Sequence, residues 1–273
     1  MPSHQTVSFL SKLHVAQTAT GTVLCVGLDP DLARLPDSFH NDAEGVAVRE
    51  FCTSIVEATA PYACAFKPNL AFFEALGADG WQVLADVIEA IPDDRLIILD
   101  AKRGDIGNSA AKYAHALYAK LGGDAVTVAP YMGRDAIVPF LQDEERCAFV
   151  LAATSNPSAV EVQQLQVGDE LLYKRVARMA VEAGVEHPGT VGLVVGATRP
   201  ELLAELRTEH PQTPFLVPGV GAQGGSAEAV LEANAGGPVL INSSRGILYA
   251  SRVADFAEAA GLAAQELAKV LPA

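Results

Sequence analysis

The sequence predicts a single-domain α/β protein in which eight parallel strands close into a (β/α)₈ barrel, the TIM-barrel fold. Three observations predict it. Short apolar segments, rich in β-branched residues, recur at fairly even intervals along the 273 residues. Amphipathic helical patterns separate most of them, which is typical of parallel sheets. Polar and glycine-rich clusters follow the segments rather than precede them, as the active sites of such barrels do.

The strands are predicted where the apolar runs are too short for helices and are bounded by turn residues. In chain order they cover residues 23–28, 63–67, 96–99, 125–129, 148–153, 191–195, 215–217 and 239–242. Eight repeats favour a closed barrel over an open, doubly wound sheet. No linker or low-complexity segment divides the chain, so residues 1–273 are predicted to form one domain.

The predicted helices carry apolar residues at positions i, i+3, i+4 and i+7. Residues 48–55 show this stripe, and so do residues 81–88 (Trp81, Leu84, Ala85, Ile88) and 172–180 (Leu172, Val176, Met179, Ala180). We expect each stripe to pack on the sheet. Residues 1–20 are expected to form a helical extension that packs on the barrel.

Composition excludes several classes of function. The formal net charge of −14 disfavours a nucleic-acid or anionic-membrane surface. No apolar run is long enough to span a bilayer, and residues 1–5 lack the basic start of a signal peptide. The four cysteines have no paired spacing, so we expect buried, reduced thiols in a cytoplasmic protein. No group of histidines, cysteines and acids has the spacing of a structural metal site.

Charged residues gather at the end of the third predicted strand. Asp100 and Lys102 follow the apolar run 96–99, and alternation along a strand makes both side chains point the same way. Gly104 then permits a sharp turn that would bring Asp105 back towards them. Such charges are costly beside an apolar strand unless they pair with each other or with a ligand. A structural ion pair, or a loop that caps the next helix, remains the alternative to a functional site.

Glycines follow the seventh predicted strand, and an arginine follows the eighth. The spacing Gly219-x-Gly221-x-x-Gly224 formally fits a dinucleotide-binding fingerprint, but the next strand ends in 242–244 without the acid that this motif requires. Glycines there, together with Arg245, instead fit the phosphate site that these barrels commonly form after strands seven and eight. A glycine turn with a solvated arginine is the alternative.

Several motifs in the same order resemble one family, the orotidine 5′-phosphate decarboxylases, and within it the longer bacterial subgroup that includes the mycobacterial enzymes. The resemblance covers most of the chain and rests on residues 26–30, 66–73, 100–108, 195–200, 218–225 and 242–246. It implies a carboxy-lyase that converts orotidine 5′-monophosphate to UMP and CO₂, the last step of pyrimidine biosynthesis, without metal or cofactor. It also implies a homodimer.

The resemblance further implies residue roles. Lys67, Asp100, Lys102 and Asp105 would form the catalytic array, in which Lys102 protonates C6 and Asp100 lies beside the substrate carboxylate. Asp105 and Ile106 would reach the neighbouring subunit's site. Asp29 and Lys67 would contact the ribose, Ser155 the pyrimidine, and Gln223 and Arg245 the phosphate. Thr154 and Ser158 are alternatives to Ser155. The remaining expected substrate-binding residues are Asn69, to which no specific role is assigned, Pro218, Gly224 and Ser244.

Two other functions stay open. A phospho-sugar aldolase or synthase of the same barrel type would use the acids to bind Mg²⁺, or a strand lysine to form a Schiff base. A non-catalytic barrel would bind a nucleotide without turnover. Segments 155–169 and 219–226 are expected to act as lids over the site.

Overall fold

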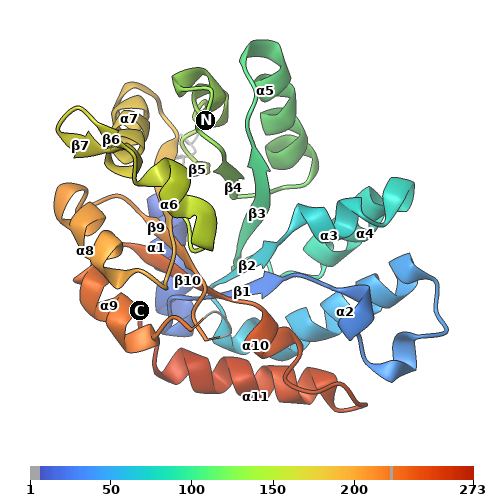
Figure 1. The fold of residues 1–273 in the computed structure, drawn as a ribbon. Coiled ribbons are helices and arrows are strands. Elements are labelled where there is room, and N and C mark those ends of the chain that lie inside the picture. Colours follow the sequence, from blue (N-terminus) through green and yellow to red (C-terminus); the bar gives the residue numbers. More distant parts are fainter. Residues whose placement is uncertain (1–6, 222–223) are drawn as a thin grey trace, which may run out of the picture.

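The computed structural model describes residues 7–221 and 224–273 and shows a closed parallel barrel (Figure 1). The strands follow one another around the barrel in the order β1-β10-β9-β8-β5-β4-β3-β2. Their bounds are β1 Leu24–Leu28, β2 Ala65–Pro68, β3 Leu96–Arg103, β4 Ala125–Val128, β5 Cys147–Ala153, β8 Thr190–Val195, β9 Phe215–Pro218 and β10 Val239–Ser243. Each coincides with one of the eight predicted strands, and the predicted (β/α)₈ fold is confirmed.

The third strand differs from the prediction, because β3 continues through Arg103 instead of ending at Leu99. The apolar run does stop at Leu99, but the strand pairs with β4 again at Arg103. Arg103 pairs with Val128 after a register shift that begins at Leu99. The polar residues that follow Leu99 therefore lie between two paired positions of one strand and not in a loop.

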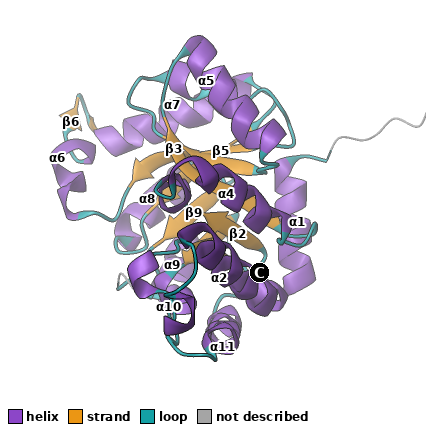
Figure 2. Ribbon diagram, turned by 90° about the vertical axis from the view of Figure 1, so that its right-hand side faces the viewer, coloured by secondary structure: helices purple, strands orange, loops and turns teal. Residues whose placement is uncertain are grey.

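Helices surround the strands on the outside of the barrel (Figure 2). They are α1 Phe9–Thr20, α2 Glu44–Thr59, α3 Leu70–Glu74, α4 Gly80–Glu89, α5 Gly107–Ala114, α6 Val160–Gln163, α7 Leu172–Glu186, α8 Pro200–Glu209, α9 Ala227–Asn234, α10 Arg245–Leu248 and α11 Phe256–Lys269. A π-helical segment, His115–Lys120, continues α5, and only short 3₁₀ turns follow β4. A two-stranded antiparallel hairpin of β6 Gln166–Val167 and β7 Glu170–Leu171 stands outside the barrel.

Of the three predicted apolar stripes, the one in α2 is confirmed, whereas the buried faces of α4 and α7 differ from the predicted ones. In α2, Val48, Phe51, Cys52 and Ile55 are all fully buried, as expected. In α4 the buried stripe consists of Val83, Leu84, Val87 and Ile88, whereas Trp81 is 43% exposed. The sequence pattern is ambiguous by about one position here, because apolar residues occur on both possible faces. In α7 the fully buried positions are Tyr173, Ala177, Ala180 and Ala183, and Val176 and Met179 pack partly buried against them.

The first helix closes the N-terminal end of the barrel. Phe9 is fully buried and meets Phe149 of β5 edge to face, with ring centroids 6.0 Å apart. Lys12 forms ion pairs with Asp124 and Glu145 at 3.3 and 2.9 Å. In Figure 2, α1 lies to the right of the strands and α6 with β6 lies to the left, at the opposite end. With one mouth filled by α1, the other mouth is left for a ligand.

All four cysteines are buried and free. Across residues 7–221 and 224–273, no helix is long and apolar enough to cross a membrane.

Candidate functional site

A cavity of about 500 Å³ opens at the carboxyl ends of the barrel strands. The residues that line it come from almost every strand end, as expected for a barrel whose other mouth is filled. Nine of the residues expected from the sequence are among them: Asp29, Lys67, Asn69, Asp100, Lys102, Ser155, Pro218, Ser244 and Arg245. The structure therefore gathers residues that lie more than 200 positions apart in the chain.

Asp100 is the centre of the charged group in this cavity. Its Oδ2 accepts a hydrogen bond from Nζ of Lys67 at 2.8 Å, and its Oδ1 accepts one from Nζ of Lys102 at 2.5 Å. The Lys67 side chain is only 5% exposed, whereas that of Lys102 is 52% exposed. Lys67 is thus a buried anchor for the carboxylate, and Lys102 presents its ammonium group to the cavity.

The pKa values of this group follow from burial and charge. Burial by itself would lower the pKa of Lys67, but the negative charges of Asp100 and Asp29 outweigh it and raise that pKa above its ordinary value. Burial would raise the pKa of Asp100, but Lys67 and Lys102 outweigh it and lower that pKa below its ordinary value. Both side chains are therefore charged at neutral pH.

Thr127 of β4 belongs to this group, although the sequence reading did not select it. Its hydroxyl accepts a hydrogen bond from the backbone N–H of Lys102 and donates one to Oδ1 of Asp100, both at 2.9 Å. The residue is 2% exposed and lines the cavity. One signal was available: Thr127 is the polar position inside an otherwise apolar predicted strand.

Asp105 and Ile106 do not line the cavity of their own chain. Oδ1 of Asp105 accepts the N–H of Ile106 at 2.8 Å, and Asp105 forms no ion pair with any residue in the described ranges. Within one chain, no ion pair or hydrogen bond in the described ranges joins Asp105 to Asp100 or Lys102, so its place in the charged array stays a prediction. β3 ends at Arg103, so the turn at Gly104 follows the strand directly.

The loop after β9 has the backbone that glycine permits. Gly219, Gly221 and Gly224 have φ values of 104°, 78° and 88°, a region that side chains with a Cβ rarely adopt. Gly219 lines the cavity, whereas Gly224 is exposed and does not. Gln223 lies outside the described residues. The Gly219-x-Gly221-x-x-Gly224 spacing therefore reflects a tight loop beside the cavity, in which these three positions require a positive φ.

Arg245 reaches the cavity from the first position of α10. Its side chain is exposed, and within the described part of the chain it has no hydrogen bond or ion pair. In a protein with a net charge of −14, a guanidinium without a carboxylate partner is available to an anionic ligand.

Three buried polar atoms that line the cavity have no hydrogen-bond partner among residues 7–221 and 224–273: Oδ1 of Asp29, Oδ1 of Asn242 and Oγ of Ser244. Buried polar atoms are nearly always satisfied in folded proteins, so these indicate a ligand. Gly27 lets the side chains of Asn242 and Ser244 lie against the backbone of β1, because a Cβ at Gly27 would lie 2.8 Å from Cβ of Ser244 and 2.9 Å from Oδ1 of Asn242. Asn242 was not predicted as a site residue.

Hydrogen bonds from Tyr249, which follows α10, and from Gln163 of α6 hold two of the loops at the cavity. The hydroxyl of Tyr249 donates to the carbonyl oxygen of Asp29 and accepts the N–H of Asp31, both at 2.7 Å. Gln163 accepts the N–H of Thr154 through Oε1 at 2.9 Å and donates to its Oγ1 through Nε2 at 2.7 Å. Thr154 and Ser155 both line the cavity, and Ser158 does not. Oδ1 of Asn69 accepts the N–H of Ala71 at 3.3 Å and so caps α3.

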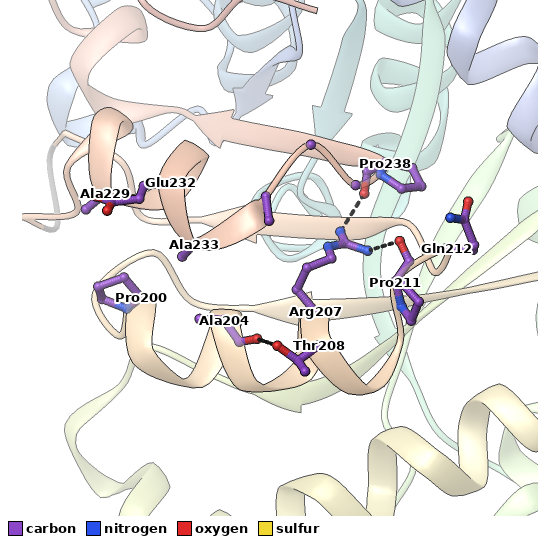
Figure 3. Close-up of a pocket in the computed structure, with 13 residues that line it drawn as sticks. Pro200, Ala204, Arg207, Thr208, Pro211, Gln212, Ala229, Glu232, Ala233 and Pro238 are labelled. Atoms are coloured by element: carbon purple, nitrogen blue, oxygen red, sulfur yellow. Dashed lines mark hydrogen bonds between the residues drawn. The ribbon is translucent and has the colours of Figure 1, made fainter.

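A larger depression, of about 670 Å³, lies between α8 and α9 (Figure 3). Its buried charged residue is Arg207, which is 4% exposed and covers the ring of Phe215 at 3.7 Å. The guanidinium donates to the carbonyl oxygens of His210, Pro211, Thr213 and Pro238 and to Oδ1 of Asn234. Because its donors are all used within the protein, Arg207 is a structural residue and not a ligand-binding one.

The donor set at the barrel mouth suits an anion better than a metal ion. Both oxygens of Asp100 already accept hydrogen bonds from ammonium groups. In the described residues, no group of three or more histidines, cysteines or acids lies close enough to hold a metal.

Comparison with known proteins agrees with this geometry. Residues 22–260 match the family described as orotidine 5′-phosphate decarboxylase / HUMPS. A protein of Herpetosiphon aurantiacus named orotidine 5′-phosphate decarboxylase is 47% identical over 259 residues, covering 94% of this chain and 95% of that protein.

Solved structures give the same result. The OMP decarboxylase of Leishmania donovani superimposes with a TM-score of 0.82 at 40% identity, covering 96% of this chain and 98% of that one. The UMP synthase of the same organism gives a TM-score of 0.84 at 42% identity, and there the match covers 97% of this chain but 57% of the larger protein. The chain therefore belongs to the orotidine 5′-phosphate decarboxylase / HUMPS family.

Proposed function

We propose that this chain converts orotidine 5′-monophosphate to UMP and CO₂ in pyrimidine biosynthesis. The observation that carries the proposal is one cavity with two ends. At one end, Lys67 and Lys102 hold the two oxygens of Asp100. At the other, Arg245 and the glycine loop after β9 offer a cation and exposed backbone to a phosphate. A phosphorylated nucleoside with an anionic ring substituent has complementary groups at both ends.

The chemistry follows from the charge of Lys102. When the bond between C6 and the carboxylate breaks, its electron pair remains on C6 as a carbanion that the ring hardly delocalises. An ammonium about 4 Å away, at an effective dielectric constant near 20, stabilises such a charge by roughly 4 kcal/mol. Nζ of Lys102 then gives a proton to C6, and water reprotonates the amine. This scheme needs no cofactor.

Asp100 has two tasks in this scheme. It orients Lys102 through the contact at 2.5 Å, and it lies next to the position proposed for the substrate carboxylate. Lys67, buried behind it, keeps the carboxylate of Asp100 ionised.

The remaining roles extend the proposal along the substrate. Asp29 and Lys67 contact the ribose hydroxyls, which gives the unpaired Oδ1 of Asp29 a donor. Ser155 contacts the pyrimidine, with Thr154 as the alternative in the same cavity. Gln223, Gly224, Ser244 and Arg245 hold the phosphate, and Pro218 and Asn69 complete the walls. Binding energy from the distant phosphate would close segments 155–169 and 219–226 and orient the ring.

We further propose a homodimer in which Asp105 and Ile106 complete the neighbouring site. Apolar side chains are exposed where β3 and β4 end: Ile106 is 51%, Tyr131 94% and Met132 54% exposed. Side chains of this kind on one surface are typical of an interface. Asp105, which has no ion-pair partner in the described part of its own chain, would meet Lys102 of the other copy.

Mixing two inactive variants tests this arrangement. In a Lys102→Ala and Asp105→Ala heterodimer, one of the two sites regains both residues. Random exchange of subunits gives half heterodimers, so the mixture should recover about a quarter of wild-type activity. Recovery of no activity by a mixture shown to contain heterodimers would contradict the shared site.

The decarboxylation itself is tested with purified protein, orotidine 5′-monophosphate and EDTA, by following the loss of substrate absorbance as UMP forms. Rapid conversion in EDTA supports the proposal. Absence of conversion by folded, dimeric protein would contradict it, and a phospho-sugar substrate with Mg²⁺ would then be tried. The cytoplasm is the proposed location, consistent with four buried free cysteines.

A further inference from the structure

The backbone of Lys102 is in an unusual conformation. Its φ is +46°, and among the described residues the one other non-glycine residue with a positive φ is Ala235, where α9 ends. This left-handed region is costly for a residue with a Cβ, and it persists only where the surroundings enforce it. At Lys102 the conformation occurs inside a strand and at the position of the proposed proton donor, so the group that enforces it bears on the chemistry.

Thr127 contacts this backbone, in the stretch between Leu99 and Arg103 where the register of β3 with β4 shifts. Its Oγ1 accepts the backbone N–H of Lys102 at 2.9 Å and donates to Oδ1 of Asp100 at 2.9 Å. The directions are fixed, because the amide can only donate and the ionised carboxylate can only accept. The same Oδ1 accepts a hydrogen bond from Nζ of Lys102 at 2.5 Å. A closed ring of hydrogen bonds thus begins at the amide of Lys102 and ends at its ammonium group.

The position of Thr127 makes this ring rigid. It lies in β4, is 2% exposed, and pairs in register with Phe149 of β5. A β-branched side chain in a strand has few χ1 rotamers, so the packed backbone fixes the hydroxyl. A valine of nearly the same shape would fit the apolar strand but would leave the N–H of Lys102 without a partner.

We propose that Thr127 is a positioning residue for the reaction, holding the left-handed backbone of Lys102 and one oxygen of Asp100 so that the ammonium faces the reacting carbon. This inference rests on the proposed function, since it assigns a task to Thr127 only if Lys102 is the proton donor. It predicts that the hydroxyl affects turnover and not affinity, because the phosphate and ribose contacts lie elsewhere in the cavity.

The test compares Thr127→Val with Thr127→Ser in the full-length protein. Loss of a hydrogen bond to a charged group predicts that kcat falls by about 30-fold or more in Thr127→Val. The KM for orotidine 5′-monophosphate and the Kd for UMP should change by less than about threefold. Thr127→Ser keeps the hydroxyl and should stay within about threefold of the wild-type kcat. Rates are expressed per UMP-binding site, so that loss of folded protein does not count as loss of turnover.

Thr59→Val is the matched control. Thr59 is fully buried in α2 and does not line the cavity, and its hydroxyl donates to the carbonyl oxygen of Ile55 at 2.7 Å. The same chemical change there should leave kcat per site within about twofold of wild type. A fall in kcat common to both valine variants would overturn the inference, since it would reflect a general effect of a deleted core hydroxyl.

Other outcomes are equally decisive. A folded Thr127→Val protein with wild-type kcat overturns the inference, and so does a loss in Thr127→Ser as large as in Thr127→Val. If the valine variant does not fold, Thr127→Ala is measured in its place, and the serine comparison still applies. Lys102→Ala distinguishes a failure of the proposed function from a failure of the inference on Thr127. An active Lys102→Ala protein refutes Lys102 as the proton donor. An inactive Lys102→Ala protein together with a fully active Thr127→Val protein refutes only the inference on Thr127.

Discussion

Replacing Arg245 with alanine separates the recognition of phosphate from that of the nucleoside. Arg245 is exposed at the cavity, without an ion-pair partner in the described part of the chain. Its removal therefore breaks no hydrogen bond or ion pair within the described protein, and the temperature of unfolding should hardly change. What is lost is a cation beside the proposed phosphate site.

The size of the loss follows from charge and exposure. A unit charge pair about 4 Å apart is worth roughly 4 kcal/mol at an effective dielectric constant of 20 and roughly 1 kcal/mol in bulk water. Arg245 is solvent-exposed, which moves the value towards the lower figure, whereas a phosphate monoester carries nearly two charges, which raises it. We expect a net loss of about 2–3 kcal/mol, which is about a 30- to 150-fold rise in the Kd for UMP.

Isothermal titration with UMP and with uridine gives the measurement. Uridine has no phosphate, so its Kd should rise by less than about threefold in Arg245→Ala. Arg245→Lys is the matched control, because it keeps the charge but loses the paired donors, and it should fall between wild type and alanine. The difference between the two ligands should also shrink at high salt. An equal loss for UMP and uridine would refute the phosphate role of Arg245.

Three further predictions concern the array and the scaffold. Lys102→Ala should abolish measurable turnover of orotidine 5′-monophosphate while UMP binding changes by less than about tenfold; near-normal kcat would remove Lys102 as the donor. Asp100 has a folded-state pKa below its ordinary 3.8, so its ionisation stabilises the fold above about pH 4 and the benefit is lost as the pH falls through the folded-state value. The difference in unfolding free energy between wild type and Asp100→Asn should thus be constant from about pH 5 to 8 and shrink below pH 4; a difference that grows in acid would contradict this sign. Arg207→Met should lower the free energy of unfolding by about 3 kcal/mol, because it leaves buried carbonyls unpaired, with kcat unchanged. Urea denaturation checks it, with the exposed Arg252→Met as the control, and an equal effect of the two changes would argue against a structural role for Arg207.

The sequence by itself determined the order and approximate limits of the strands. Apolar, β-branched runs such as 96–99 and 125–129 are dictated by burial on both faces of a parallel sheet, and that pattern is local. The same is true of the polar residues at strand ends. Because all parallel strands end at one mouth, Lys67, Asp100 and Arg245 could be assigned to one site before their distances were known.

Only the tertiary structure decided how these residues meet. The continuation of β3 to Arg103 depends on pairing with β4, which residues 96–103 alone do not encode. Thr127 belongs to the charged site because β4 lies beside β3, so that the Thr127 hydroxyl accepts the backbone N–H of Lys102. Asp105 was expected near Asp100 from a turn that the local sequence permits, yet in the structure its carboxylate accepts the N–H of Ile106 and does not line the cavity. Local patterns fix which residues are buried or polar, whereas register between strands fixes which atoms touch, and register is a property of the closed barrel as a whole.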